Sequence, residues 1–540
     1  MDETDPIEIP WWKRAVFYQI YPRSFLDTNG DGIGDLPGVI ERLPYIASLD
    51  VDAIWLSPFF RSPMKDFGYD VSDYRDVDPL FGTLADFDRL LEEAHGLGLR
   101  VIIDQVWSHS SDRHPWFHAS AGRRDGFDDW YVWADARPDG TPPNNWQASF
   151  GGCAWTWHPG RRQYYFHNFL SSQPDLNFHC EAVQDAILDV ARFWLDRGVD
   201  GFRLDVINYL AHDRQLTDNP VAGYRAKPDA TIRFQRQVHN KSQPEALAFV
   251  ARLRALLDSY DDRFAVGEIF DDDMLGRQKE YTDGKDRLHT AYSFHLLNAR
   301  EATPALFATG IEAWMGASGW PSWSLANHDV PRFATRLAGD DKALTLLLLA
   351  VLLSLRGTPF LYQGDELGLP QAHVPLDRLQ DPFAIASWTE DERNAGRDGA
   401  RTPMPWSADQ PNAGFSSAPE CWLPADPAHA TLSVERQEAE LGSLLAWTRR
   451  LLAFRGRHPA LQAGDIRMLE SERDMLAFER SFGAERILCV FNIARRSASF
   501  SLRNHPGSKL LEANGAAEMP GDFLEVLPSG WAFMLVGPDS

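Results

Sequence analysis

The chain has 540 residues, of which 44% are hydrophobic and 24% are charged, a globular composition that excludes wholesale disorder, collagen and coiled coil. Its net charge of −24, from 53 Lys and Arg against 77 Asp and Glu, disfavours nucleic acid and acidic membrane surfaces as partners. At roughly 150 residues per domain the length suggests three or four domains, although a single α/β barrel can hold ~250 residues or more.

The N-terminus and the cysteines favour a cytoplasmic protein. Residues 1–5 are acidic and no apolar stretch follows them, so we expect no signal peptide. The longest apolar run, 343–355, is too short to span a bilayer and predicts a buried helix. The four cysteines (153, 180, 421 and 489) fit unpaired thiols of a reducing compartment. We therefore expect no membrane partner, and a monomer or a homodimer.

Short β-type runs recur along the chain and alternate with helical patterns. They cover residues 15–21, 53–57, 101–104, 201–205, 264–268, 291–295, 324–329 and 359–363. Most are apolar on both faces, which is typical of parallel strands covered by helices, and the segments between them show the helical period. The sequence therefore predicts an α/β fold, a (β/α)₈ TIM barrel, whose chemistry lies at the C-terminal ends of the strands.

Two regions break this alternation. Residues 105–175 are rich in Gly, Pro, Asn and aromatic residues, and seven of the 19 Trp fall between Trp107 and Trp157. A connection of that length is a small domain or a lid. Near the end, antiparallel strands are predicted over 475–482, 487–493, 499–502 and 531–536. We thus predict a barrel of 1–104 and 176–456, an inserted domain of 105–175 and a C-terminal β-domain of 457–540.

Four acidic residues end predicted barrel strands: Asp104, Asp205, Glu268 and Asp329. A single Asp at a strand end usually caps a helix or forms a turn. Four acids gathered on one barrel face repel one another and raise at least one pKa, which costs stability unless function needs it. The pattern indicates an active site built from carboxylates.

At this point the chain resembles the α-amylase superfamily (glycoside hydrolase family 13), and in particular its α-glucosidase and oligo-1,6-glucosidase branch. The resemblance covers nearly the whole chain and rests on motifs in the family's order. They are WWKRAVFYQIYPRSFLDTNGDGIGDLPGV at 11–39, GYDVSDY at 68–74, DQVWSH at 104–109, QPDLN at 173–177, GFRLDVIN at 201–208, VGE at 266–268, NHD at 327–329, GTPFLYQGDELG at 357–368 and GRDGARTPMPW at 396–406.

The resemblance implies roles for the acids. Asp205 would be the nucleophile, Glu268 the general acid, and Asp329 would hold the 2- and 3-hydroxyls of the sugar. Carboxyls roughly 5–5.5 Å apart would give retention of configuration. Arg203 lies two residues before Asp205, so both point to one face of the strand, and its charge would keep Asp205 ionised.

The resemblance also implies a pocket for one glucose. Its walls and hydroxyl contacts are expected from Tyr69, His109, Phe150, Phe169 and His328. Asp70 would bind the 4- and 6-hydroxyls and pair with Arg397, which would block further sugars and make the enzyme exo-acting. Arg401 is expected to reach the leaving group rather than the pocket.

An acidic loop follows the first strand. Asp27, Asn29, Asp31 and Asp35 place oxygen donors along a glycine-containing turn, as in the first half of an EF-hand, but position 38 is Gly where a complete EF-hand has Glu. A solvated acidic turn is the alternative. The resemblance puts a structural Ca²⁺ or Mg²⁺ here, with the Ile33 carbonyl as a further ligand, and implies no organic cofactor.

We expect a retaining exo-α-glucosidase for small α-glucosides of the maltose and isomaltose type, with sucrose as a further candidate and with transglucosylation. A transferase or isomerase that forms trehalose or a sucrose isomer through the same glucosyl-enzyme is the alternative. A non-catalytic transporter subunit is disfavoured because all three acids are kept, and an endo-amylase because Asp70 and Arg397 would close the pocket. The linkage stays open, although Val206 after the nucleophile accompanies α-1,6 cleavage in relatives of the branch.

Overall fold

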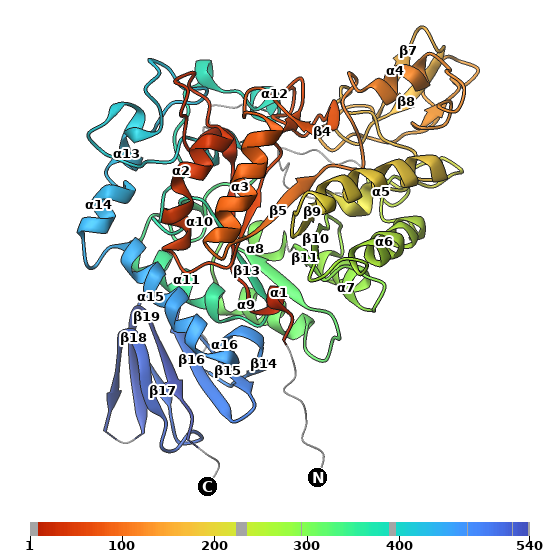
Figure 1. Cartoon of the computed structure of the whole chain (residues 1–540). Coiled ribbons are helices and arrows are strands. Elements are labelled where there is room, and N and C mark those ends of the chain that lie inside the picture. The colour runs from red at the N-terminus through yellow and green to blue at the C-terminus, as the bar shows by residue number, and fades with distance from the viewer. Residues whose placement is uncertain are drawn as a thin grey trace.

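The computed structural model describes residues 9–222, 235–292, 294–387, 396–471, 474–520 and 522–537. Eight parallel strands close into a barrel in the order β1-β13-β12-β11-β10-β9-β5-β2 (Figure 1). They are β1 (Phe17–Ile20), β2 (Ala53–Leu56), β5 (Arg100–Gln105), β9 (Gly201–Leu204), β10 (Phe264–Glu268), β11 (Thr290–Tyr292), β12 (Pro321–Ser324) and β13 (Thr358–Tyr362). The predicted (β/α)₈ barrel is confirmed.

Helices cover the barrel. The larger ones are α2 (Leu36–Ala47), α3 (Leu84–Gly96), α5 (Glu181–Asp196), α6 (Pro244–Leu257), α7 (Met274–Thr282), α9 (Pro304–Ala313), α11 (Lys342–Ser354) and α15 (Leu444–Arg457). Of these, α2, α3 and α5 are clearly amphipathic. On α5 the buried residues include Val183, Ile187, Val190 and Trp194, the face that the helical period predicted. The long apolar run forms α11, which is buried from Thr345 to Ser354. None of the described helices combines the length and the apolar character that crossing a membrane requires.

Strand seven of the barrel lies earlier than the sequence predicted. The predicted run, 324–329, begins where β12 ends. The β12 sequence PSWS is polar and hides its strand character, yet Ser322 donates to the Ala291 carbonyl inside the barrel. The side chain of Asn327 accepts the Asp329 N–H and closes a turn. Asp329 therefore stands on a loop beyond the strand rather than at its last position.

Two other strand ends shift by a few residues. Asp104 lies inside β5, which continues to Gln105. Of the run predicted at 291–295, residue 293 lies outside the described residues and Phe294 already begins the short helix α8 (Phe294–Leu297). The predicted acidic N-terminus, 1–5, also lies outside them.

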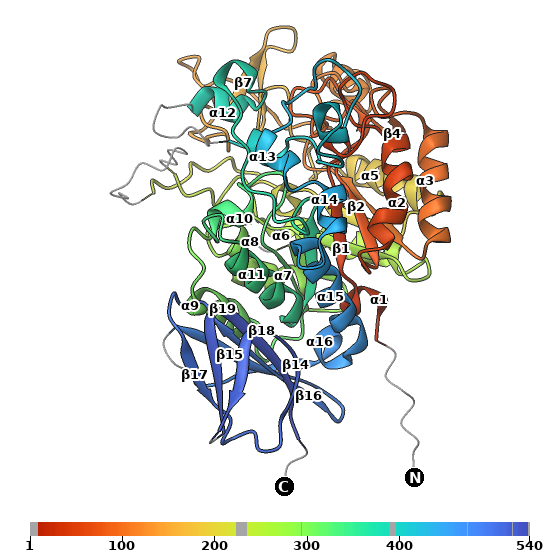
Figure 2. The ribbon, with the colours of Figure 1, turned by 90° about the vertical axis from the view of Figure 1, so that its left-hand side faces the viewer.

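A small antiparallel sheet follows β5, in the aromatic region. Its strands are β6 (Trp133–Ala134), β7 (Trp155–His158) and β8 (Gln163–Phe166), in the order β6-β8-β7. Trp146, Trp155 and Phe166 pack together as its core. In Figures 1 and 2 this sheet lies at the top of the molecule, at the opposite end from the C-terminal sheet.

The C-terminal sheet has six strands rather than the four predicted. Strands β15 (Met475–Phe482), β16 (Glu485–Asn492), β17 (Ala498–Ser501) and β19 (Phe523–Leu535) correspond to the predicted ones, although β19 begins earlier. Strands β14 (Asp465–Met468) and β18 (Lys509–Met519) are additional. Their sequences, DIRM and KLLEANGAAEM, lack a clear alternation of apolar and polar residues. These segments are therefore strands because they pair with β15 and β19, and not because of their local sequence pattern.

Two buried arginines lie where this sheet meets the barrel. Arg455 of α15 donates to the carbonyls of Leu353 (2.9 Å) and Leu461 (2.6 Å). Arg480 of β15 donates to the Leu461 carbonyl (3.0 Å) and to that of Ser354, the last residue of α11. Burial lowers the pKa of Arg455 to about 10 and that of Arg480 to about 9. Arg480 thus binds a helix-end carbonyl across the junction, and Arg455 binds neighbouring helix-end carbonyls on the barrel side.

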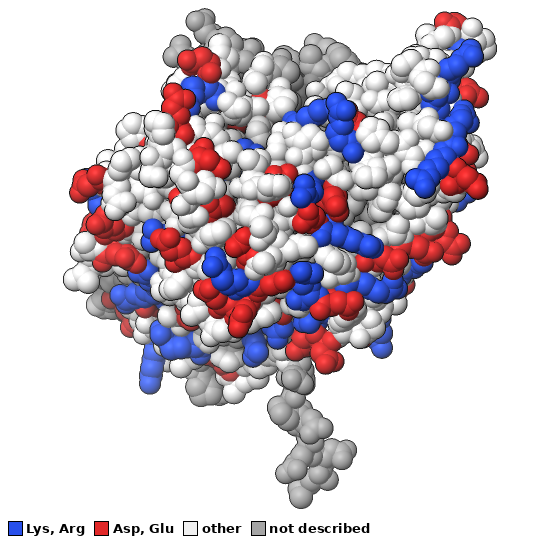
Figure 3. All heavy atoms as spheres, turned by 45° about the horizontal axis from the view of Figure 1, so that its top comes forward, with Lys and Arg blue, Asp and Glu red and all other residues white. Residues whose placement is uncertain are grey.

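The charges are mixed on the face seen from the top of the molecule. Figure 3 shows acidic and basic side chains interspersed there, with uncharged surface between them. The net charge of −24 is therefore not concentrated into a single acidic field on this face.

Candidate active site

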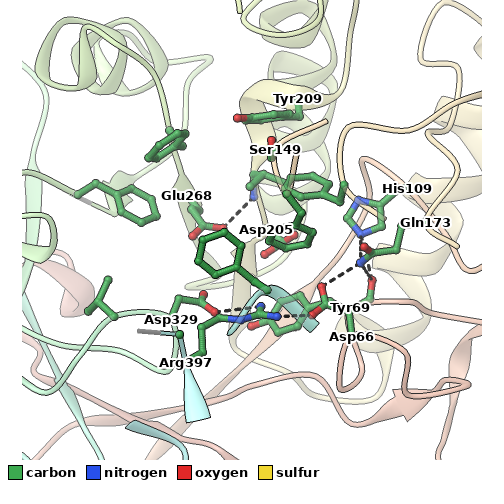
Figure 4. Close-up of a pocket in the computed structure, with 18 of the residues that line it drawn as sticks. Asp66, Tyr69, His109, Ser149, Gln173, Asp205, Tyr209, Glu268, Asp329 and Arg397 are labelled. Carbon is green, nitrogen blue, oxygen red and sulfur yellow. Dashed lines mark hydrogen bonds and ion pairs between the residues drawn. The ribbon is translucent and has the colours of Figure 1, made fainter. Parts of the chain in front are cut away.

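A cavity of about 430 Å³ opens at the C-terminal ends of the barrel strands (Figure 4). Of the predicted site residues, it is lined by Tyr69, His109, Phe150, Phe169, Asp205, Glu268, Asp329 and Arg397. The other predicted residues of the sugar site, Asp70, Arg203, His328 and Arg401, are completely buried around it. The barrel thus brings together Asp205, Glu268 and Asp329, although the first and the last of them lie 124 residues apart in the sequence.

One guanidinium group forms ion pairs with three carboxylates at the base of the cavity. Arg203 Nη1 lies 2.8 Å from Asp104 Oδ1 and 2.6 Å from Asp205 Oδ1. Its Nη2 lies 2.6 Å from Glu268 Oε2. The carbon of the guanidinium sits 5.0 Å from the ring centre of Trp55, so an aromatic face covers the cation. The expected pairing of Arg203 with Asp205 is confirmed, and it extends to Asp104 and Glu268.

Burial and charge separate the proton affinities of the acids. Burial raises the pKa of Glu268 to about 8, against the opposing effect of Arg203. Burial also raises the pKa of Asp205, to about 7, again opposed by Arg203. For Asp329 burial acts in the same direction, but His328, Arg401 and Arg397 outweigh it and hold the pKa below its usual range. Asp329 is therefore the strongest acid of the three, and burial raises the proton affinity of both Asp205 and Glu268.

A strained turn follows Asp205. Val206 has φ 35° and ψ 48°, a left-handed conformation that β-branched residues rarely adopt. This turn directs the Val206 N–H to Glu268 Oε2, at 3.1 Å. The backbone beside one acid thus fixes the carboxyl group of the other.

Arg401 supports Asp329 from behind, so its predicted contact with the leaving group is wrong. Its Nη2 lies 2.7 Å from Asp329 Oδ1, and its Nε donates to the His328 carbonyl at 2.7 Å. The side chain is completely buried and does not line the cavity. Arg401 therefore orients the carboxylate and contributes positive charge.

The predicted pair of Asp70 with Arg397 is also wrong. The carboxylate of Asp70 is buried and accepts the side chain of Ser62 and the N–H groups of Lys65 and Asp66, at 2.8 to 3.0 Å. Arg397 Nη2 instead lies 2.8 Å from Asp66 Oδ1. Asp70 thus shapes the turn that presents Asp66 to the cavity.

The sequence offered a signal for Asp66, because the stretch KDFGYD contains two acids, of which Asp66 alone lines the cavity. Phe67 (φ 52°) and Gly68 (φ 108°) turn the chain between them. An alternation argument does not hold through such a turn, so the sequence could not tell which acid points inward.

Tyr69 and His328 form a stacked pair beside the acids. Their rings lie 5.4 Å apart at 5° to each other, and Tyr69 Oη lies 2.5 Å from His328 Nε2 and 3.1 Å from Asp104 Oδ2. His328 Nδ1 lies 2.8 Å from Gln19 Nε2, so both ring nitrogens have protein partners. Burial lowers the pKa of His328 to about 3, which keeps the ring neutral.

His109 faces the cavity next to Gln173, a lining residue to which the sequence assigned no role. His109 Nε2 lies 3.0 Å from the Tyr69 carbonyl and 3.2 Å from Gln173 Nε2. Gln173 donates to Asp66 Oδ2 at 3.1 Å. Burial lowers the pKa of His109 to about 4. The QPDLN motif already contained Gln173, but only the structure shows where its amide points.

Aromatic rings line the cavity on several sides. Phe150 lies 5.8 Å from Phe169 and 6.2 Å from Phe383, and the guanidinium of Arg397 sits 5.4 Å from the Phe150 ring centre. The predicted aromatic walls, Phe150 and Phe169, therefore do lie in this cavity. Other apolar lining residues were not predicted, because their segments carry no motif: Tyr209, Phe270, Phe294 and Phe383.

The acidic loop after β1 is closed by its own hydrogen bonds. Asp27 accepts the N–H groups of Asn29, Gly30 and Gly32, at 2.8 to 3.0 Å. Asp35 accepts the Gly38 N–H and thereby caps α2. In the described parts of the chain no three His, Cys, Asp or Glu residues form a group arranged to hold a metal ion.

The donor chemistry of this loop nevertheless suits a hard cation, since it consists of carboxylate and amide oxygens. Asp27, Asn29, Asp31, Asp35 and the Ile33 carbonyl would supply the ligands. The four side chains already accept backbone N–H groups of the loop and of α2, which holds their oxygens in place. The bound cation stays a prediction.

Family comparisons cover both parts of the chain. The family described as alpha amylase, catalytic domain, matches residues 19–464, and the family described as maltogenic amylase, C-terminal domain, matches residues 466–524.

Relatives and solved structures span nearly the whole chain. A probable alpha-glucosidase of Rhizobium meliloti (strain 1021) is 50% identical over 97% of this chain and 96% of its own length. An oligo-1,6-glucosidase of Heyndrickxia coagulans is 35% identical over 91% and 93%. The crystal structure of an alpha-glucosyl transfer enzyme is 48% identical, with a TM-score of 0.92 over 98% of this chain and all 100% of the other. A trehalulose synthase structure is 34% identical, with a TM-score of 0.88 over 98% and 100%.

Proposed function

Because this chain belongs to the α-amylase family of glycoside hydrolases, in its α-glucosidase and oligo-1,6-glucosidase branch, we propose that it removes single glucose units from the non-reducing ends of small α-glucosides with retention of configuration. The observation that carries the proposal is the position of Arg203. Its guanidinium touches Asp205 and Glu268 on two different nitrogens, in a cavity that can hold a sugar. Two carboxylates held this close suit the double displacement of a retaining glycosidase.

In the first step Asp205 attacks the anomeric carbon while Glu268 protonates the departing oxygen. A covalent glucosyl-enzyme results, and the leaving sugar departs neutral. In the second step the ionised Glu268 removes a proton from water, which attacks the same carbon and releases glucose. Burial raises the pKa of Glu268 to about 8, which supports its role as the group that begins protonated, while Arg203 opposes the effect of burial on Asp205.

Asp329 stays ionised throughout, held between Arg401 at 2.7 Å and Arg397 at 3.5 Å. A permanent carboxylate there accepts hydrogen bonds from the sugar hydroxyls and stabilises the positive charge that develops on the ring. Such charge stabilisation by groups already in place lowers the barrier without reorganisation.

The buried pair of Asp66 and Arg397 supports exo action. It occupies the wall beside Tyr69, with both side chains anchored, and leaves Asp66 Oδ2 and Arg397 as polar groups for the far hydroxyls of one glucose. A sugar attached at those hydroxyls would collide with the pair. The role first expected of Asp70 thus passes to Asp66.

A time course of products from maltose, isomaltose, sucrose and trehalose tests the proposal. We expect glucose from the first sampling onward, initially as the α-anomer. Initial release of β-glucose would exclude retention, and initial formation of maltose rather than maltotriose from maltotetraose would exclude the removal of single glucose units.

Transfer of glucose to a second sugar is a further candidate, since an alpha-glucosyl transfer enzyme is 48% identical over nearly the whole chain. The cavity supports it as well, because Phe270, Phe294 and Phe383 present apolar surface on which an acceptor sugar can pack. New oligosaccharides that accumulate at high maltose or sucrose, at the expense of free glucose, would establish transfer.

A further inference from the structure

Lys241 is a buried cation beside the active-site cavity, with 3% of its surface exposed. Its Nζ lies 3.2 Å from Tyr209 Oη and 3.0 Å from the Phe270 carbonyl. It also lies 5.0 Å from the ring centres of both Tyr209 and Phe270. Among the described residues no carboxylate forms an ion pair with it. Burying an ammonium group without a carboxylate costs stability, so its hydrogen bonds and the two aromatic faces must hold it here.

Both partners of Lys241 line the cavity and follow the two catalytic acids closely in sequence. Tyr209 comes four residues after Asp205, and Phe270 comes two residues after Glu268. Lys241 therefore joins the loop after β9 to the loop after β10. A contact at this point fixes the spacing of the two segments that carry the acids.

The Phe270 backbone is held by a second group from the same loop. Asn208 Nδ2 donates to the Phe270 carbonyl at 3.0 Å, and the Phe270 N–H donates to Asn208 Oδ1 at 3.3 Å. The Phe270 carbonyl thus accepts Asn208 and Lys241 together. Ser242, next to Lys241, reinforces the junction by donating to Asp271 Oδ2 at 2.6 Å.

The part of the cavity wall that Tyr209 forms lies away from the end that is closed by Asp66 and Arg397. In Figure 4 Tyr209 is on one side of Glu268 and Asp205, and Arg397 and Asp66 are on the other. If glucose occupies the closed end, as the proposed function requires, then Tyr209 and Phe270 border the place of the next sugar. That sugar is the leaving group in the first step and the acceptor in transfer.

We propose that Lys241 is a positioning residue that holds Tyr209 and Phe270 in place as the binding wall for this second sugar. It rests on the proposed function. Lys241 does not touch substrate; it sets how firmly the leaving or accepting sugar is bound, and it leaves the chemistry at the glucose to the acids.

Lys241→Met tests the proposal, because methionine keeps a long unbranched side chain and removes the charge and the donors. α-Glucosyl fluoride serves as the substrate without a second sugar, and maltose and isomaltose serve as substrates with one. We expect kcat/KM for the disaccharides to fall on the order of tenfold, the worth of one lost hydrogen bond, and that for the fluoride to stay within about twofold. Lys285→Met, the same change at an exposed lysine, should alter neither value.

A second measurement separates this role from misplacement of Glu268. With α-glucosyl fluoride as donor and glucose as acceptor, transfer and hydrolysis share the same glucosyl-enzyme and the same base. The ratio of transfer to hydrolysis should fall several-fold in Lys241→Met, and the alkaline limb of the pH profile should keep its midpoint. Lys241→Arg, which keeps a charged donor, should recover part of the ratio.

Equal losses on fluoride and disaccharides, an unchanged transfer ratio or a displaced alkaline limb would each overturn the proposal. If Lys241→Met does not fold, Tyr209→Phe replaces it, because this change keeps the ring and removes only the hydroxyl that Lys241 meets; the same loss of transfer is then expected, and an unchanged ratio refutes the proposal. If the wild-type protein neither hydrolyses nor transfers glucose from any of these substrates, the proposed function fails instead.

Discussion

Arg397 and Asp66 meet at 2.8 Å although 331 residues separate them in the sequence. The same guanidinium nitrogen also lies 2.8 Å from Asp381 Oδ1. Asp381 in turn accepts the Phe383 N–H at the start of α12 (Pro382–Ser387), so the pair is connected to an aromatic wall of the cavity. The end of the cavity beside Tyr69 is thus fixed by Asp66 and Arg397, and each has a further polar partner: Gln173 donates to Asp66, and Asp381 pairs with Arg397.

Asp66→Asn and Asp70→Asn should therefore fail in different ways. We expect Asp66→Asn to fold normally and to lose at least tenfold in kcat/KM, mainly through KM, because the polar end of the cavity is weakened. Asp70→Asn places an amide against the N–H groups of Lys65 and Asp66 and should cost about 1–3 kcal/mol of stability. Steady-state kinetics and thermal unfolding of both variants check this. A stable Asp70→Asn protein with a raised KM would restore the role first assigned to Asp70.

Asp205→Asn should abolish turnover and leave the fold intact, because it removes the nucleophilic charge and keeps the shape. The loss amounts to many powers of ten when one member of such a unit is removed. Glu268→Gln should be severe on maltose and milder on aryl glucosides whose leaving group needs no proton. Substantial activity of Asp205→Asn on an activated aryl glucoside would show that another residue is the nucleophile.

The raised pKa of Glu268 predicts how stability depends on pH. Burial raises the pKa of its carboxyl group from about 4.3 in the unfolded chain to about 8 in the folded one, so the folded state binds the proton more tightly. This contribution is fully present below pH ~4 and is lost as the pH rises through 8. Glu268→Gln imitates the protonated form and should match the wild type in acid but exceed its unfolding free energy at pH 8–9, on the order of a few kcal/mol. Urea unfolding at several pH values measures the difference, and a constant difference would contradict the pKa.

Removal of divalent cations should lower the melting temperature more than the rate at moderate temperature. A cation that binds only the native loop of Asp27 to Asp35 stabilises the fold by mass action, and no residue of this loop lines the cavity. Thermal unfolding and initial rates with and without a chelator check this, with added Ca²⁺ or Mg²⁺ as the restoring control. Loss of activity at an unchanged melting temperature would move the cation to the active site.

Val206 should influence which bond is cleaved. The resemblance to the branch implies acceptance of α-1,6 bonds with Val here and a preference for α-1,4 bonds with Thr, and Val206 does line the cavity. A hydroxyl at this position can hydrogen-bond one leaving sugar, which is worth about 0.5–1.5 kcal/mol or up to roughly tenfold in selectivity. We expect isomaltose-type bonds to be cleaved alongside maltose-type ones, and Val206→Thr to shift the ratio of kcat/KM toward maltose.

Val206→Gly is the matched control for this position. Glycine relieves the left-handed strain at φ 35° and adds no hydroxyl, so it should not reproduce the shift toward maltose. An unchanged ratio in Val206→Thr would mean that the residue only packs and that the loop after β9 sets the linkage.

The barrel could be predicted because its strands are buried on both faces and their sequences show it. β12 was misplaced for the converse reason: PSWS carries two serines, and the Ser322 hydroxyl finds its partner, the Ala291 carbonyl, only inside the closed barrel. The same holds for β18, whose strand character comes from pairing with β19 rather than from alternation. Tertiary partners decide such segments, and the sequence does not name them.

For the site, the sequence identified which acids converge, but it did not show how the residues around those acids bond to one another. Asp205 and Glu268 sit at or directly after strand ends, where the barrel dictates direction. Asp66, Asp70 and Arg401 sit on turns and loops, where one residue of displacement reverses a side chain. The errors over Asp70 and Arg401 both arise there.

The two buried arginines at the junction have a consequence for modularity. Arg480 belongs to the terminal sheet, but the carbonyls that satisfy it include that of Ser354 at the end of α11. A chain cut before β14 would leave the Ser354 carbonyl without this donor, and the sheet grafted onto another barrel would bring a guanidinium that lacks its Ser354 and Leu461 acceptors. The barrel and the C-terminal sheet thus share a buried hydrogen bond between β15 and the end of α11. Recombination between relatives should therefore succeed only where α11 and β15 are exchanged together.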